Sequence, residues 1–404
     1  MKTAIKQFTL PVLGLLSATL AFNGATALAA ELCVNPGGTG GCYKKIQKAV
    51  DDAQPGDTVK VSAGIYNEDQ IVINKRLKVL GAGANRTIIN GRDAHLTKVG
   101  LVRITGDGDV TLSGFTLRDA GASLVNPLAD VSDWVWVRVG LFASSTATVA
   151  GNKYTITDNK IVGSGNKLDD QDYGFYAYGG EESLVFQDNE VTDTGANAVL
   201  IELHAGPTDI SYNTLDVGVW GADAIFTMTY GDLDVETPQK RNNNVINVGT
   251  GGPFNENHRA GGITFASAYR NPPYDAVDAD IGEGQFTEVQ IMRNIIYNVQ
   301  AERRGIVLWN GDIDGHPKGG NIVEPQVVGN VISGVDRHPG GRNGNGSIGI
   351  QLLGLVSDAN LRNNDFADLD IGIHLGEWFG SVPSHTQINN NRFDDVGTRV
   401  EIDD

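Results

Sequence analysis

The segment ERRGIVLWNGDIDGHPKGGNIVEPQVVGNVISGV, residues 302–335, contains two short apolar runs: GIVLW starts at Gly305, and NVIS starts at Asn330. Glycine and asparagine favour the backbone bends that separate short strands. The same two landmarks return along most of the chain with different lengths of sequence between them. This segment is therefore one unit of an internal repeat.

Asparagines provide the more regular of the two landmarks. Each is followed two residues later by an apolar side chain, and the spacing between successive members ranges from 24 to 50 residues. A minimum spacing with variable excess is typical of stacked coils, because each coil needs a minimum circuit and additional residues bulge outward. We expect these side-chain amides to hydrogen-bond from coil to coil as a ladder. The series is Asn159, Asn189, Asn213, Asn244, Asn294, Asn330, Asn364 and Asn391.

The second landmark is a small residue followed by an apolar strand, so each coil is expected to contain at least two short strands. Side chains alternate between the two faces of a strand, and the pattern therefore predicts two outward-facing columns. The first column is Tyr176, Leu200, Phe226, Thr264, Val307, Gln351 and His374. The second column is Tyr178, Glu202, Met228, Ala266, Trp309, Leu353 and Gly376.

A helix is expected near the beginning of this pattern, within residues 43–53. Ile46, Ala49, Val50 and Ala53 follow the i, i+3, i+4, i+7 spacing of one apolar helix face. Gln-Pro-Gly-Asp then ends the helix, and strand-like alternation begins. No second helix is expected after this point.

Composition supports a turn-rich β protein. The chain of 404 residues contains 52 glycines, only 7% aromatic residues, and a net charge of -18. This acidic surface disfavours nucleic acid and anionic lipid as partners, because lysine and arginine are needed to neutralise phosphates.

Residues 1–29 have the features of a secretory signal peptide: Lys2 and Lys6, an apolar run, and the cleavage pattern Ala27-Leu28-Ala29. No later apolar run has the length needed to span a bilayer. The sequence therefore predicts a secreted or periplasmic protein without a membrane span. Its mature domain would cover residues 30–404.

The two cysteines, Cys33 and Cys42, bracket the glycine-rich segment VNPGGTGG. In an exported protein this arrangement favours a disulfide that closes a small loop. The alternative is a two-ligand metal site, although neither a histidine nor a third cysteine lies nearby in the sequence.

The N-terminal IQKAVDDAQPGDTVKVSAGIYNED (46–69), the following LKVLGAGANRTIINGRD (77–93) and the repeated coils resemble the right-handed parallel β-helix proteins of the pectate lyase-like superfamily. The resemblance covers nearly all of the predicted mature chain. It implies an all-β fold: a single-stranded right-handed parallel β-helix (solenoid) with a short N-terminal capping helix. Two separate domains are the alternative, but the repeats leave no linker between them.

The superfamily contains polysaccharide lyases, hydrolases, esterases and epimerases together with non-catalytic proteins, so the fold alone assigns no activity. The chain lacks the W-[IV]-D-H and R-x-P-x-x-R patterns of pectate lyases. It also lacks G-H-G with R-I-K of polygalacturonases, and Q-D-T-L of pectin esterases. Gly64-Ile65-Tyr66-Asn67-Glu68 matches an esterase-like string that we interpret as part of the first coil.

Aromatic and polar residues on or beside the outward columns indicate a carbohydrate groove, because sugar rings stack on aromatic rings while hydroxyls need polar partners. The alternative is that these aromatic residues pack under long loops. The candidate substrate-binding residues are Tyr178, Tyr230, Tyr269, Trp309, His374, Glu377 and Trp378.

A lyase acting on a uronate must neutralise the carboxylate, remove the adjacent proton and protonate the leaving oxygen. The candidate catalytic residues are Arg270, Arg304, His316, Lys318, Glu202 and His204. Asp312 and Asp314 could bind Ca²⁺, the one candidate cofactor, although Asp-x-Asp-Gly is also a common acidic turn. A lone surface histidine usually has no catalytic role, and this is the alternative interpretation of His204 and His374.

A glycoside hydrolase would instead need two carboxylates across the scissile bond. Glu202, Asp223, Asp232 and Glu377 lie on or beside the aligned face. The leading hypothesis is an exported lyase acting on an acidic, uronate-containing polysaccharide. The alternatives are a glycoside hydrolase on the same fold and a non-catalytic glycan-binding or cell-envelope β-helix protein.

Overall fold

The computed structural model describes residues 29–92, 99–125, 135–144, 151–163, 170–217, 223–229, 233–248, 261–269, 284–300, 303–312, 320–335, 346–378 and 380–403. Residues 1–28 of the predicted signal peptide lie outside these ranges. Short strands dominate the described part of the chain, and its one helix is α1 (Ile46–Asp52). Among the described residues, no helix has the length and apolar character needed to cross a membrane.

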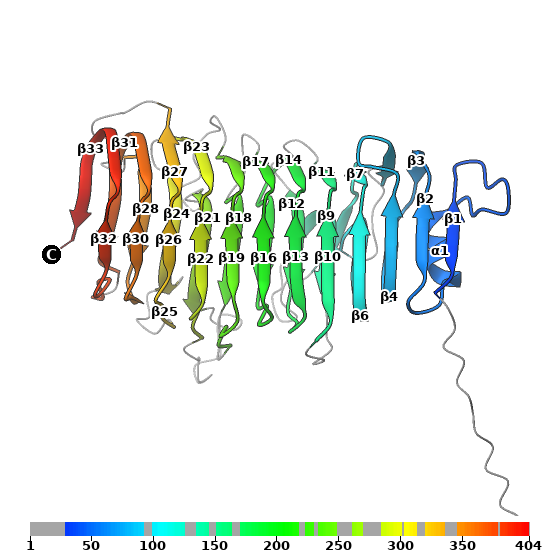
Figure 1. Ribbon diagram of the computed structural model, residues 1–404, viewed down its shortest axis with the longest axis horizontal. Helices are drawn as coiled ribbons and strands as arrows, with labels where there is room; N and C mark the ends of the chain where they lie inside the picture. Colours follow the sequence, from blue (N-terminus) through cyan, green and yellow to red (C-terminus); the bar gives the residue numbers. More distant parts are fainter. Residues whose placement is uncertain are drawn as a thin grey trace, which may run out of the picture.

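The strands form three parallel stacks that run along the long axis of the molecule (Figure 1). A complete coil contributes one strand to each stack in turn, and each strand pairs with its equivalents in the preceding and following coils. The protein is therefore a parallel β-helix, which confirms the fold that the resemblance implied.

Stack one begins beside the helix and contains the strands that precede the asparagine corner. Its members are β1 (Glu31–Val34), β2 (Thr58–Val61), β4 (Ile71–Gly81), β6 (Val102–Ser113), β10 (Lys153–Thr157), β13 (Ser183–Gln187), β16 (Thr208–Ser211), β19 (Gln239–Asn242), β22 (Val289–Met292), β26 (Gln326–Val328), β30 (Asn360–Arg362) and β32 (Gln387–Asn389).

Stack two follows the asparagine corner. Its members are β3 (Gly64–Asn67), β5 (Thr87–Asn90), β7 (Thr116–Arg118), β11 (Lys160–Val162), β14 (Glu190–Thr194), β17 (Thr214–Val217), β20 (Val245–Asn247), β23 (Ile295–Val299), β27 (Val331–Gly334), β31 (Asp365–Gly376) and β33 (Arg392–Ile402).

Stack three carries the two outward columns. It contains the first parts of β4 and β6, then β9 (Val135–Ser144), β12 (Asp170–Tyr178), β15 (Val199–Glu202), β18 (Ile225–Thr229), β21 (Gly261–Tyr269), β24 (Arg304–Asp312) and β28 (Ile348–Leu353), and finally the second parts of β31 and β33. The last two strands bend between stacks at Asp368 and Asp395, whose φ angles are 54° and 47°.

Three short strands lie outside this scheme. β8 (Ala122–Val125) pairs antiparallel with β9, while β25 (Ile322–Val323) and β29 (Val356–Ser357) form a separate parallel pair.

In most strands of the three stacks, alternate residues point into a continuous apolar core. One interior column contains Ile156, Phe186, Ile210 and then Arg241 in consecutive coils. Arg241 is fully buried, and its guanidinium donates to the hydroxyls of Thr208 and Thr227. Burial lowers the pKa of Arg241 to about 9.

The predicted asparagine ladder is confirmed at the corner between stacks one and two. The backbone N–H and side-chain Nδ2 of Asn213 donate to Oδ1 of Asn244, both at 3.0 Å, and Asn244 donates to Asn294 in the same way. The residue before each ladder asparagine has a positive φ, as at Asp188 and Tyr212. The ladder thus satisfies buried backbone groups at a bend that recurs in every coil.

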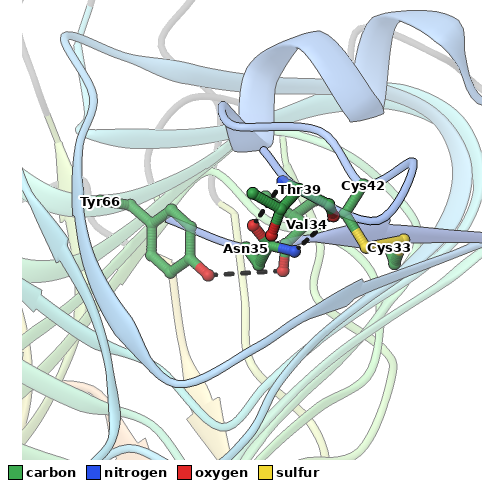
Figure 2. The surroundings of a disulfide bond; sticks show 6 residues. All are labelled: Cys33, Val34, Asn35, Thr39, Cys42 and Tyr66. Carbon is green, nitrogen blue, oxygen red and sulfur yellow. Dashed lines mark hydrogen bonds between the residues drawn. A yellow bond between two sulfur atoms is a disulfide. The ribbon is translucent and has the colours of Figure 1, made fainter. Parts of the chain in front are cut away.

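The N-terminal region contains the predicted helix and disulfide. α1 buries Ile46, Ala49 and Val50 against the first strands. Cys33 and Cys42 are joined at an S–S distance of 2.07 Å, which confirms the disulfide and excludes the two-ligand metal alternative. Figure 2 shows the loop between the cysteines, in which the side chain of Asn35 exchanges hydrogen bonds with the backbone of Thr39.

Candidate functional site

The two predicted outward columns are present in the expected register along stack three. Tyr176 aligns with Leu200, Phe226, Thr264, Val307, Gln351 and His374 in consecutive coils. The second column aligns Tyr178 with Glu202, Met228, Ala266, Trp309, Leu353 and Gly376. We call this surface of stack three the outer face.

A cavity of about 190 Å³ lies at the C-terminal end of the outer face, and we call it the C-terminal cleft. Four of the predicted site residues line it, although they are far apart in the sequence. The complete lining is Arg304, Gly346, Ile348, Gln351, Leu353, Ile371, His374, Glu377, Trp378, Glu401 and Asp403.

A chain of hydrogen bonds crosses the floor of the cleft. Arg304 Nε donates to Gln351 Oε1 at 2.8 Å, and Gln351 Nε2 lies 2.9 Å from His374 Nδ1. His374 Nε2 then lies 3.1 Å from Asp403 Oδ1, and the other oxygen of Asp403 accepts from the backbone N–H of Glu377. These hydrogen bonds link side chains from four segments: β24, β28, β31 and the segment after β33.

This chain determines the tautomer of His374. Because Arg304 can only donate, Gln351 turns its carbonyl oxygen toward the arginine and its NH₂ group toward His374. His374 Nδ1 is then an acceptor, and Nε2 carries the proton that points to Asp403. The hydrogen bond from His374 and the backbone N–H of Glu377 lower the pKa of Asp403.

Two tryptophans form an aromatic wall beside the cleft. The rings of Trp309 and Trp378 meet edge to face with centroids 6.2 Å apart, and both side chains are half-buried. Glu377 is exposed and accepts a hydrogen bond from the backbone of Gly380. An apolar wall beside carboxylates suits a sugar residue, which presents both C–H faces and hydroxyls.

A second cluster, which we call the tyrosine cluster, lies toward the N-terminal end of the outer face. Tyr176 packs against Phe142, Tyr173 and Tyr178 at centroid distances of 5.4 to 6.2 Å. Its hydroxyl donates to Glu202 Oε2 at 2.5 Å. Burial and the adjacent Glu202 raise the pKa of Tyr176, so this hydroxyl stays protonated.

His204 lies outside both clusters and is buried. Its Nδ1 faces the carbonyl oxygen of Gly179 at 2.8 Å, and its Nε2 faces that of Glu182 at 3.0 Å. Burial lowers its pKa. With both nitrogens directed at backbone oxygens, His204 holds the turn at residues 179–182 and presents no nitrogen to the outer face.

Asp223 is buried beside the outer face, where Thr264 Oγ1 donates to its carboxylate at 2.7 Å. Burial raises its pKa to about 6, although Thr264 and Arg303 favour the charged form. It is therefore a carboxyl group with an elevated pKa that lies under the face, in contact with the first outward column.

Several predicted residues cannot be placed. Tyr230, Asp232, Arg270, Asp314, His316 and Lys318 lie outside the described residues. Tyr269 and Asp312 are paired at the ends of β21 and β24, which locates their backbones only. Within the described ranges, no group of three or more histidine, cysteine or acidic side chains is arranged to hold a metal ion. The calcium site at Asp312 and Asp314 stays a prediction.

Sequence reasoning missed Glu401 and Asp403 as cleft residues. Glu401 aligns with His374 across β31 and β33, so the outward column continues for one more coil. The coil could have been identified from Asn391, the last landmark. The last part of its strand, RVEI at residues 399–402, however, does not begin with a small residue and an apolar one.

No family model and no curated protein matches the sequence. Among solved structures, the chain is similar to the A-module of mannuronan C-5 epimerase AlgE6 from Azotobacter vinelandii. The identity is 15%, the match covers 89% of this chain and 93% of that chain, and the TM-score is 0.46.

It is also similar to the catalytic domain of a GH87 alpha-1,3-glucanase in complex with tetrasaccharides, with 13% identity, coverage of 89% and 64%, and a TM-score of 0.45. A family 28 exopolygalacturonase from Yersinia enterocolitica matches with 13% identity, coverage of 90% and 78%, and a TM-score of 0.34. Likeness at this level assigns no activity to the present chain.

Proposed function

We propose that the protein is an exported polysaccharide-active enzyme whose glycan lies on the outer face and places one sugar residue in the C-terminal cleft. The observation that carries this proposal is the convergence of Arg304, His374, Glu377 and Trp378 with Asp403 around one cavity. A cation, an imidazole, carboxylates and an indole at one opening are the groups that bind and transform a sugar.

Lyase action on a uronate is the first reaction to consider. Arg304 would offset the uronate charge, and His374 would exchange a proton once Gln351 releases its Nδ1. In this mechanism, further cations would come from Arg270, His316 and Lys318. Ca²⁺ would be bound by Asp312 and Asp314. Lyase activity by this mechanism requires that these residues lie close to the cleft.

Hydrolysis of a glycosidic bond is the second candidate, and the composition of the cleft favours it. Three carboxylates, Glu377, Glu401 and Asp403, line the cavity beside a single arginine. A glycosidase needs one carboxylic acid to protonate the leaving oxygen and one carboxylate to act as base or nucleophile. Glu377 and Glu401 would fill these roles, while Asp403 orients His374.

Glycan binding without turnover is the third candidate. Its support is that Arg304, Gln351, His374 and Asp403 already satisfy one another by hydrogen bonds. In such a site the cleft would hold a sugar end, and the solenoid would act as a rigid support.

Export and the role of α1 also belong to this proposal. Removal of residues 1–29 would start the mature domain immediately before β1, and the Cys33–Cys42 disulfide fits an oxidising compartment. The helix would cap the first coil, because its buried residues contact β1, which pairs with no earlier strand among the described residues.

The deciding experiment incubates the purified protein with alginate, pectate, glycosaminoglycans and neutral glycans, with Ca²⁺ and with chelator. Absorbance of unsaturated uronates reports a lyase, and new reducing ends without that absorbance report a hydrolase. Binding without either product supports the third candidate. If no glycan in the panel gives either product, and none of them binds, the proposal is wrong.

A further inference from the structure

An arginine lies at the N-terminal side of the tyrosine cluster. Arg103 on β6 pairs with Phe142 of β9, and Phe142 pairs in turn with Tyr176 of β12. The neighbours of Arg103 in the strand, Val102 and Ile104, are fully buried, so the arginine points outward. The first outward column therefore extends to Arg103, two strand-to-strand steps before Tyr176.

The contacts of the Arg103 guanidinium fix its position but use few of its donors. Its Cζ lies 4.5 Å from the centroid of the Phe142 ring, which is a cation–π contact. Its Nη1 donates to the backbone oxygen of Val99 at 3.3 Å, a long hydrogen bond. Among the described residues this is the one hydrogen bond of a side chain that carries five N–H donors.

Arg103 also has no acidic partner within the described part of the chain. By contrast, Arg92 forms an ion pair with Asp69. The buried Arg303 lies near Asp223, whose carboxylate favours the charged guanidinium. Burial lowers the pKa of the half-buried Arg103. In a chain with a net charge of -18, a cation that is partly withdrawn from water without a counter-ion is unusual.

Arg304, the arginine of the C-terminal cleft, is bound differently. Its Nε donates to Gln351 at 2.8 Å, and its Nη1 donates to the backbone oxygens of Arg303 at 3.2 Å and Gly346 at 3.3 Å. Several donors of Arg304 are thus used within the protein. Of these two outward-column neighbours, Arg103 is the better placed to offer a pair of N–H groups to an anion.

The tyrosine cluster supplies the other surfaces that a sugar needs. The rings of Tyr173, Tyr176 and Tyr178 are half-buried, so part of each is open to solvent. Glu202 lies one step beyond Tyr178 and accepts from the Tyr176 hydroxyl. Three strand-to-strand steps separate Arg103 from Glu202, a distance of about 14 Å at about 4.8 Å a step. The cluster therefore has a cation at one end and a carboxylate at the other.

We propose that Arg103 and the tyrosine cluster form a subsite for an acidic sugar residue, in which the guanidinium pairs with a carboxylate or sulfate group of the glycan. The planar guanidinium can bind such an oxyanion through two parallel hydrogen bonds. The sugar would stack on the tyrosine rings, with its charged group toward Arg103 because Glu202 would repel it at the other end. This inference rests on the proposed function, since it specifies the class of glycan, and it applies to all three candidate activities.

Isothermal titration calorimetry of the purified protein tests the subsite. The ligands are fragments of pectate, alginate and a sulfated galactan, each beside a neutral form made by carboxyl reduction or desulfation. We expect at least one acidic fragment to bind the wild type more tightly than its neutral form. Arg103→Gln should weaken binding of that acidic fragment at least about tenfold and leave binding of the neutral form unchanged. Arg103→Lys keeps the charge and should lose less affinity than Arg103→Gln. A loss with pectate or alginate identifies the carboxylate, and a loss with the galactan identifies the sulfate.

Arg362→Gln is the matched control, because Arg362 is an exposed arginine on β30 of stack one, away from the outer face. It should bind like the wild type, and thermal melts confirm that each variant is folded. If glycans bind but Arg103→Gln binds every acidic fragment as tightly as the wild type, the proposed function stands and the subsite is wrong. The subsite is also wrong if acidic and neutral forms lose affinity equally, or if the lysine variant or the control loses as much as Arg103→Gln. If no glycan binds the wild type, the proposed function fails and the subsite fails with it.

Discussion

At the scale of single residues, each corner of the asparagine ladder depends on the hydrogen bonds of one asparagine side chain. Asn244 accepts two hydrogen bonds from Asn213 and donates to the carbonyl oxygen of Ile210 at 2.9 Å, and it is fully buried. Its removal leaves buried donors and an acceptor without partners, which costs more than the bonds themselves contribute.

We therefore predict that Asn244→Ala lowers the free energy of unfolding by about 3 kcal/mol, measured by urea denaturation. Asn360→Ala is the control. Its half-buried side chain makes one hydrogen bond, 2.9 Å to Gln326, and its loss should cost about 1 kcal/mol or less. Equal losses in the two variants would refute a special role of the ladder.

Glu182 couples stability to pH. Its side chain is buried, its Oε2 has no hydrogen-bond partner among the described residues, and burial raises its pKa from 4.5 to about 7. Between these two values the folded state holds the proton and the unfolded chain does not. The contribution of Glu182 is therefore fully present below pH 4.5 and is lost as pH rises to about 7.

We predict that Glu182→Gln flattens the pH dependence of stability in this window, because glutamine remains neutral. At pH 8 the variant should be more stable than the wild type by at most about 3 kcal/mol, and below pH 4.5 the two should be similar. Thermal melts at several pH values measure this difference. A variant whose stability falls with pH as steeply as that of the wild type would show that Glu182 is not the responsible group.

At the scale of elements, α1 is short, and its packing rather than its intrinsic propensity maintains it. Ala49 is fully buried against the first strands. We predict that Ala49→Asp destabilises the protein by about 3 kcal/mol or more, because it places an unpaired carboxylate at that contact. The exposed Lys48→Ala is the control on the same helix and should change stability by less than about 1 kcal/mol. If both variants melt like the wild type, the helix does not protect the first coil.

The strands of the outer face could be predicted in register from the sequence, because each begins with a small residue and alternates with period two. Tyr176 to His374 form one column and Tyr178 to Gly376 form the other, as predicted. The strands of stack one were not separated in advance, because strands such as β10 and β13 lead into the asparagine corner and have no landmark of their own.

The candidate site was predictable only in part. Arg304, His374, Glu377 and Trp378 were candidates from their positions, but the cleft that joins them depends on Asp403, which follows His374 by 29 residues. Arg241 gave no signal either, because QKRN has the composition of an exposed turn although its arginine points into the core. Contacts between distant side chains are set by the stacking of coils, which one local pattern does not encode.

At the scale of the whole molecule, the outer face connects the tyrosine cluster with the C-terminal cleft. Tyr176 and His374 are separated by six strand-to-strand steps of stack three. At about 4.8 Å a step, the two sites are about 29 Å apart. A glycan that occupies both must span this distance.

We therefore predict that affinity rises with oligosaccharide length until the chain reaches both sites, and then levels off. Tyr178→Ala should weaken binding of the long oligosaccharides and leave that of the short ones unchanged. Isothermal titration calorimetry with a length series of one glycan tests this. Affinity that is independent of length would mean that a single site accounts for binding.

Calorimetric titration of wild type and Trp378→Ala with alginate, pectate and glycosaminoglycan fragments tests whether the C-terminal cleft binds a glycan. Tyr212→Asn is the control, because Tyr212 is an exposed aromatic residue between stacks one and two, and asparagine tolerates its φ of 61°. We predict that at least one glycan binds, that Trp378→Ala weakens its binding at least about tenfold, and that the control does not. If no fragment binds, or if wild type and Trp378→Ala bind with equal affinity, the C-terminal cleft is not the glycan site.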